Sequence, residues 1–176
     1  ESTIRLRTQN VLSGLPVGED FDWVDRVSIE LTTQMLATLF DFPFEDRRKL
    51  TRWSDVATGG PETGVVESDE QRQEELLECL EYFTRLWQER AKKGGSNDFI
   101  SMLVHGDATK DMSPEEYLGN LILLIVGGND TTRNSMTSGV IALNDNPGEY
   151  AKLRNNPMLI PNMVSEIIRW QTPLAH

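Results

Sequence analysis

One stretch decides the fold of this chain: residues 113–144 read SPEEYLGNLILLIVGGNDTTRNSMTSGVIALN. It opens with a capping box, in which Ser113 is the N-cap, Pro114 takes the first helical position and Glu116 takes the third. Helical residues then continue as far as the Asn-Asp-Asn-Pro sequence at 144–147. The pattern predicts a helix of about 31 residues, or ~46 Å at 1.5 Å per residue, well above the average length in globular proteins.

Poor helix formers lie deep inside this predicted helix. Gly127 and Gly128 follow the apolar run 121–126, and Asn-Asp-Thr-Thr comes next at 129–132. Each glycine costs about 1 kcal/mol relative to alanine, so the pattern indicates that something approaches the backbone closely or that a side chain bonds into the helix. The Thr131 hydroxyl can compete for the Gly127 carbonyl four residues earlier, and we expect it to open the helix locally.

The same stretch carries groups suited to proton chemistry. Asp130 has a carboxylate able to take up and relay protons, while Leu123, Val126 and Gly127 lie about one turn earlier and form an apolar wall. A turn after a buried strand at 121–126 is the alternative, but the capping box and the helical continuation argue against it. The stretch is not a phosphate loop, because no Gly-Lys-Ser/Thr follows the glycines.

Helical patterns and helix-ending residues also dominate the rest of the chain. No convincing strand precedes Pro173, where one could begin, so the predicted fold class is mainly α. A loop rich in glycine and proline at 58–64 separates two of the helices. Besides the long one, the predicted helices cover approximately 4–13, 22–40, 45–56, 69–93, 148–154 and 159–170.

A second motif, Glu166-Ile-Ile-Arg169, lies in the last of these helices. Its i, i+3 spacing places the carboxylate and the guanidinium on one face, where they can pair with each other or order a shared network. Taken alone, such a pair is an ordinary helix salt bridge.

Composition excludes several classes of protein. The 176 residues carry 17 Lys and Arg against 28 Asp and Glu, for a formal net charge of −11, whereas nucleic-acid binding needs clustered basic residues. One cysteine excludes an internal disulfide, and with two histidines it excludes an ordinary zinc cluster. The run 121–126 is far shorter than the ~20 apolar residues that span a bilayer, so we expect no membrane anchor in this segment and a cytoplasmic protein. The helix-like sequence that starts at Glu1, without a Met, and the end shortly after Pro173 predict a fragment.

Taken together and in this order, the two motifs are much more specific. A long helix with Gly-Gly-x-Asp-Thr-Thr, followed 36 residues after Asp130 by Glu-x-x-Arg, resembles the cytochrome P450 superfamily. The resemblance extends from residue 1 to about 170 and implies the D to K helices, so that residues 1–176 form the central part of a single P450 catalytic domain. It makes the long helix the I helix, which crosses the distal face of the haem, and Glu166–Arg169 the K-helix motif. Residues 21–43, 126–134 and 168–176 look similar to bacterial soluble P450s that hydroxylate the terminal carbon of medium-chain alkanes.

The resemblance also implies roles for individual residues. Thr131 matches the threonine that holds dioxygen, and Asp130 matches the neighbouring acid of the proton route. Gly127 and Gly128 fit the groove for oxygen and substrate. The positions that match substrate contacts are Leu123 and Val126, the structural pair is Glu166 and Arg169, and the helices at 45–56 and 69–93 match the lid over substrate access.

The cofactor implied by the resemblance is haem b with a cysteine thiolate ligand. Cys79 lies between Glu78 and Leu80 without flanking glycines, so we expect a free helical thiol, an iron ligand outside this chain, and no metal ligand within it. We expect His176 to approach a haem propionate. The chain alone is expected to be inactive.

The intact protein is expected to be a monooxygenase that acts on medium-chain alkanes or fatty acids. The implied partners are dioxygen, a small apolar substrate, and a ferredoxin with its ferredoxin reductase, which deliver electrons from NADH. Two alternatives stay open: a P450 that acts on steroids or terpenoids, and a non-catalytic helical module that binds a ligand.

Overall fold

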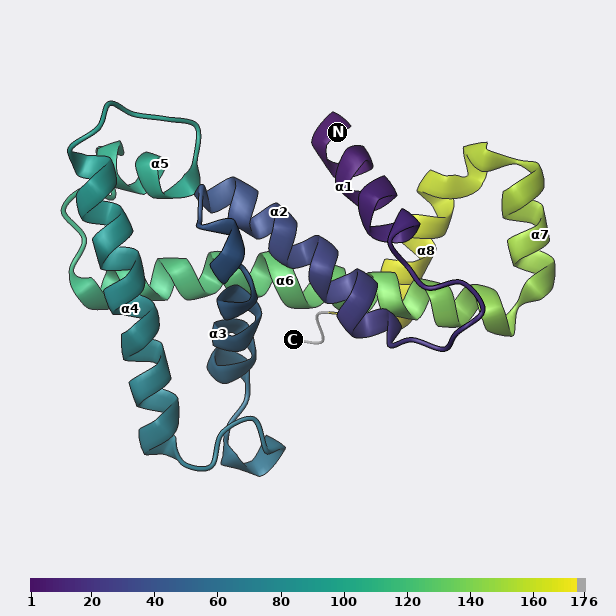
Figure 1. Cartoon of the computed structure of the whole chain (residues 1–176), viewed down its shortest axis with the longest axis horizontal. Coiled ribbons are helices and arrows are strands. Elements are labelled where there is room, and N and C mark those ends of the chain that lie inside the picture. Colours follow the sequence, from purple (N-terminus) through teal and green to yellow (C-terminus); the bar gives the residue numbers. More distant parts are fainter. Residues whose placement is uncertain (174–176) are drawn as a thin grey trace. The chain divides into compact units, whose positions relative to one another are not determined.

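The computed structural model describes residues 1–173, and within that range every regular element is a helix. This confirms the mainly α prediction, and residues 174–176, into which a strand that begins at Pro173 would continue, lie outside the described residues. Figure 1 shows the α-helices in order. They are α1 (Ser2–Ser13), α2 (Glu30–Phe40), α3 (Arg48–Thr58), α4 (Asp69–Ala91), α5 (Phe99–His105), α6 (Pro114–Asp145), α7 (Pro147–Asn155) and α8 (Ile160–Gln171). Short helical turns join them: the π-helix η1 (Val24–Ile29) and the 3-10 helices η2 (Phe44–Asp46), η3 (Pro61–Thr63) and η4 (Pro157–Leu159).

Helix α6 is 32 residues long and begins as its sequence predicts. The Ser113 backbone N–H donates to the Glu116 carboxylate at 2.8 Å, and the Glu116 backbone N–H donates to the Ser113 hydroxyl at 3.2 Å. Both halves of the capping box are therefore formed.

The helix predicted after Asp22 differs from the expectation. It starts as the π-helix η1 and becomes α-helical only at Glu30. The Asp22 carboxylate accepts a hydrogen bond from the Asp25 backbone N–H at 3.1 Å, and Ser28 is fully buried within η1. The change of winding has no signal in the apolar spacing, which fits either helix type over so short a segment.

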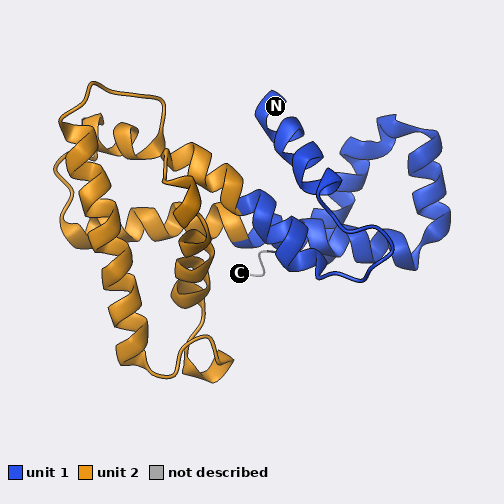
Figure 2. Ribbon diagram, viewed as in Figure 1, with its two compact units in different colours: residues 1–32, 130–176 blue, residues 33–129 orange. Residues whose placement is uncertain are grey.

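The chain divides into two compact units (Figure 2). Unit 1 contains residues 1–32 and 130–176, and unit 2 contains residues 33–129. One boundary falls within α2, and the other falls within α6, between Asn129 and Asp130.

Unit 2 has an aromatic core. The rings of Phe42 and Trp53 meet edge to face at 6.2 Å, and those of Phe40 and Phe83 do so at 5.4 Å. All four side chains are buried, as are the α6 residues that pack with them, which include Leu121 and Ile125. Such edge-to-face pairs add to the stabilisation that burial of the rings supplies. The first half of α6 is thus anchored in this core.

Helices α3 and α4 are joined by polar bonds along their length. Arg52 forms a bidentate pair with Glu75, at 2.6 Å from Nε and 2.5 Å from Nη2, and Lys49 pairs with Glu78 at 2.6 Å. Arg72 of α4 donates to the Val56 and Ala57 carbonyls at the end of α3. These bonds hold the two helices as one hairpin, the segment that the resemblance identifies with the lid.

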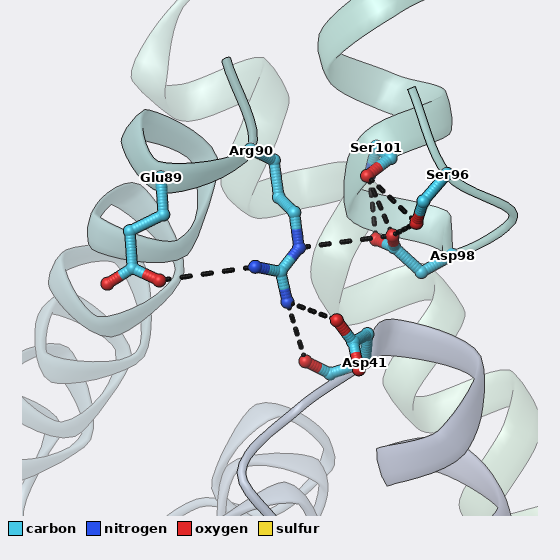
Figure 3. Close-up of polar contacts among 6 residues, drawn as sticks. All are labelled: Asp41, Glu89, Arg90, Ser96, Asp98 and Ser101. Atoms are coloured by element: carbon cyan, nitrogen blue, oxygen red, sulfur yellow. Dashed lines mark hydrogen bonds and ion pairs between the residues drawn. The ribbon is translucent and has the colours of Figure 1, made fainter. Parts of the chain in front are cut away.

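A buried arginine near the end of α4 joins this helix to the residue after α2 and to the N-cap of α5 (Figure 3). Arg90, near the end of α4, donates through Nη2 to the Asp41 carbonyl at 2.9 Å and to its carboxylate at 2.6 Å. Its Nε lies 3.9 Å from the buried Asp98 carboxylate, which also caps α5 by accepting from the Ser101 backbone N–H at 2.8 Å. Burial alone would raise the pKa of Asp98, but hydrogen bonds from Ser101 and Ser96 and the charge of Arg90 lower it on balance.

In unit 1 the second half of α6 packs closely on α8. A Cβ atom placed on Gly139 would lie 2.9 Å from Cδ1 of Ile167, so any larger residue there would have to displace the end of that side chain. No helix in the described part of the chain is both long enough and apolar enough to cross a membrane.

Candidate active site

The predicted site residues lie along the middle of α6, which stays α-helical at every residue from Pro114 to Asp145. The local opening expected at Gly127 is therefore wrong. Asn129, one turn from Ile125, is fully buried with it, so this face of the helix packs on both sides of the glycine pair. That packing offsets the weak helix propensity of the two glycines.

The two glycines have different surroundings. A Cβ atom on Gly128 would lie 2.7 Å from Cδ2 of Leu36, whereas one on Gly127 would meet nothing within 4 Å. Leu36 is itself buried and has little room to move. Gly128 thus lets α2 approach α6, while Gly127 leaves an open strip of backbone. Leu123, on the same helical face as Gly127, is 71% exposed, and Val126 is half-buried.

This difference gives a paired prediction. Gly128→Ala forces a methyl group against the Leu36 side chain and should lower the free energy of unfolding by about 1–3 kcal/mol. Gly127→Ala adds a methyl group in open space and removes a glycine from a helix, so stability should stay level or rise by up to about 1 kcal/mol. Urea unfolding of the two variants tests the assignment, and equal losses would contradict it.

Asp130 has a charged partner that the sequence reasoning missed. Nη2 of Arg133 lies 2.9 Å from Asp130 Oδ1, and both side chains are more than four-fifths buried. The signal was available, because Asp130 and Arg133 have the same i, i+3 spacing as Glu166 and Arg169. The acid on α6 is therefore held by a cation on its own helix.

Thr131 lines an apolar cavity within unit 1. The cavity has a volume of about 720 Å³, and its walls come from α1, η1, α2, α6 and α8. Apolar side chains, Trp23 and Val27 among them, form most of the lining, and Thr131 and Ser135 border the cavity from α6. The arrangement presents a few polar groups to an otherwise apolar space, as small-molecule sites do.

The K-helix pair forms as predicted on α8. Arg169 donates to Glu166 through two bonds, at 2.8 Å from Nε and 2.6 Å from Nη2. The pair is more than half exposed, and the hydrogen bond from Arg169 lowers the pKa of Glu166. Glu166 also borders a second cavity of unit 1, of about 590 Å³, between α6, α7 and α8. The contact is confirmed, and its structural role stays a prediction.

Cys79 is unsuited to hold iron. It is a free thiol, fully buried on α4. Burial raises its pKa to about 12, and the negative charge of the nearby Glu78 adds to this effect. A metal-binding cysteine needs the opposite, a thiolate favoured by its surroundings. Residues 1–173 contain no group of three or more His, Cys, Asp or Glu side chains that could hold a metal ion. His176, the predicted propionate contact, lies outside the described residues.

The described residues therefore supply one part of a haem site and lack the iron ligand. The cavity that Thr131 borders offers an apolar wall of the kind that a flat macrocycle requires. The described residues supply this wall and none of the thiolate.

Comparisons with known proteins find similar sequences and structures over nearly the whole chain. No protein-family model matches the chain. The steroid C26-monooxygenase of Mycolicibacterium smegmatis is 31% identical in an alignment of 176 positions that covers 99% of this chain and 40% of that relative. The structure of cytochrome P450-153 from Novosphingobium aromaticivorans is 50% identical, with a TM-score of 0.86 over 99% of this chain and 42% of that one. CYP153D17 from Sphingomonas sp. PAMC 26605 is 51% identical, with a TM-score of 0.84 over 96% of this chain and 42% of that one.

The helices of this chain, together with the solved structures that they match, define part of a cytochrome P450 fold. The chain belongs to the cytochrome P450 superfamily, whose members bind haem. It spans about two fifths of the length of the relatives it matches.

Proposed function

We propose that these residues form the central part of a single catalytic domain of a haem-thiolate monooxygenase. The reaction inserts one atom of dioxygen into an unactivated C–H bond and reduces the other atom to water, with two electrons and two protons. We assign the electrons to NADH, delivered through a ferredoxin reductase and a ferredoxin, and we place the enzyme in the cytoplasm. The observation that carries the proposal is Thr131 at the wall of an apolar cavity, directly after Asp130, a largely buried acid that is paired with Arg133.

The residues of α6 have distinct tasks in this reaction. The haem, when bound through a thiolate from outside residues 1–173, supplies the centre that activates dioxygen. Asp130 takes up a proton at its carboxylate and passes it toward the Thr131 hydroxyl, which presents it to the reacting oxygen. The lining of the cavity is mostly apolar, which disfavours ordered water beside this route and so favours proton delivery along it.

The substrate class we assign is medium-chain alkanes or fatty acids, attacked at the terminal carbon. Support comes from the resemblance over residues 21–43, 126–134 and 168–176 and from the two similar structures at about 50% identity. The apolar side chains at Leu123 and Val126 suit a hydrocarbon chain, which offers no polar group to bind. The Mycolicibacterium relative, named a steroid C26-monooxygenase, favours a steroid as the second candidate.

Product analysis of the holoenzyme separates these substrates. We expect primary alcohols from a series of n-alkanes between hexane and dodecane, and terminal hydroxylation of the matching fatty acids. A steroid supplied under the same conditions should give little product. Steroid turnover without alkane turnover would transfer the assignment to the second candidate. No product from any of these, in protein that binds the substrates and carries haem, would favour a non-catalytic ligand-binding module.

A further inference from the structure

The ion pair between Asp130 and Arg133 differs from other pairs with the same spacing. The Glu149–Lys152 pair on α7 is mostly exposed, whereas both side chains of Asp130–Arg133 are more than four-fifths buried. Exposed pairs contribute little and exchange readily with water. Removing one partner of a largely buried pair costs more than removing one partner of an exposed pair, so we expect the two side chains to be strongly coupled.

Arg133 limits the directions in which the Asp130 oxygens can point. The terminal torsion of an aspartate is broad, so a carboxylate on a helix can turn its oxygens freely unless a partner fixes them. The guanidinium at 2.9 Å from Oδ1 is such a partner. It comes from the same helix, one turn after Asp130, so the helix fixes its place relative to that carboxylate.

The turn that carries Arg133 is itself tied to a second element of unit 1. The Thr137 hydroxyl donates to the Arg133 carbonyl at 3.0 Å, and it lies 2.9 Å from the hydroxyl of Ser28. Because Thr137 uses its only hydroxyl proton on the carbonyl, Ser28 is the donor of the second bond. Ser28 is fully buried in the π-helix η1, a helix type that is frequent near functional sites.

We propose that Arg133 is a positioning residue for the reaction. It holds the Asp130 carboxylate in one orientation toward Thr131, and the bonds through Thr137 and Ser28 fix the turn from which it does so. The inference rests on the proposed function, since it assigns a task to Arg133 only if Asp130 delivers protons. Loss of a purely structural salt bridge would lower stability and leave the amount of product formed per NADH unchanged.

The test uses the holoenzyme with Arg133→Gln, Arg133→Lys and the matched exposed control Lys152→Gln. Arg133→Gln should lower product per NADH and the kcat for product by about tenfold, with KM and haem content unchanged. Arg133→Lys, which keeps the charge, should recover a large part of this loss, and Lys152→Gln should match the wild type. Crystal structures provide the second readout: Asp130 should adopt one conformer in the wild type and a rotated or split conformer in Arg133→Gln.

Several outcomes would overturn the inference. They are an unchanged Asp130 conformer with tight coupling in Arg133→Gln, and an Arg133→Lys variant that loses as much product as Arg133→Gln. If Arg133→Gln does not fold, Arg133→Lys carries the test with the same two readouts, and an unchanged conformer alongside lost product would refute positioning. Asp130→Asn separates the two proposals. Tight coupling in Asp130→Asn removes the proton role proposed for Asp130, and this inference with it, whereas poor coupling in Asp130→Asn with tight coupling in Arg133→Gln removes only this inference.

Discussion

Replacement of Thr131 by alanine is expected to separate electron consumption from product formation. In the holoenzyme, Thr131→Ala should still oxidise NADH but should lower product per NADH by about 10- to 100-fold, because the proton donor at the reacting oxygen is lost. The electrons then reduce dioxygen to hydrogen peroxide, which takes the same two electrons and two protons that the productive reaction uses. Simultaneous measurement of NADH, alcohol and peroxide gives the partition directly.

Two variants control for the loss of a side chain from the cavity wall. Thr131→Ser keeps the hydroxyl and should stay largely coupled. Thr132→Ala removes a methyl group and a hydroxyl from the neighbouring position of the same cavity, and it should change the partition little. Haem content should be normal in all three proteins. Tight coupling in Thr131→Ala, or equal uncoupling in Thr132→Ala, would refute the role assigned to Thr131.

The long helix was predictable because its signals are local. The capping box occupies four consecutive residues, and the structure forms both of its hydrogen bonds. The Glu166–Arg169 pair was equally accessible, since i, i+3 spacing fixes its geometry within one turn. Features of this kind need no knowledge of what the helix packs against.

Other features depend on residues far apart in the chain. The sequence marked Gly127 and Gly128 as one motif, but only the position of Leu36 gives Gly128 its packing role. The opening expected at Gly127 was wrong because tertiary packing supports a continuous helix. Arg133 was overlooked for a different reason. Its pairing with Asp130 is local, but its burial, which makes the pair strong, depends on the surrounding helices.

The contacts of Arg90 with Asp41 and Asp98 could not be predicted from local sequence patterns. Arg90 lies in a helix rich in charged residues, 49 positions after Asp41 and separated from Asp98 by a glycine-containing loop. Its neighbour Glu89 has a similar sequence context and stays exposed on the helix surface. Only the fold distinguishes the buried cation from the solvated charges around it.

Substitution of Arg90 should therefore cost more stability than substitution of any exposed pair. Arg90→Met removes the cation from a site where its side chain is 10% exposed and the Asp98 side chain is 4% exposed. We expect the free energy of unfolding to fall by about 3 kcal/mol, toward the lower end for a broken buried pair, because Ser96 and Ser101 still bond to Asp98. Urea unfolding measures the change. Arg52→Met is the control, and it should cost less than about 1 kcal/mol because the Arg52–Glu75 pair is partly solvated.

The pH dependence of this loss identifies its source. The pKa of Asp98 is lower in the folded protein than its ordinary value, so its ionised form favours folding above the unfolded pKa. That contribution disappears as the pH falls through the folded pKa. Arg90→Met removes one cause of the lowered pKa, so the stability difference between wild type and variant should be largest near neutral pH and shrink in acid. A difference that stays constant between neutral pH and the acid limb would show that Arg90 acts through packing of its alkyl chain and not through its charge.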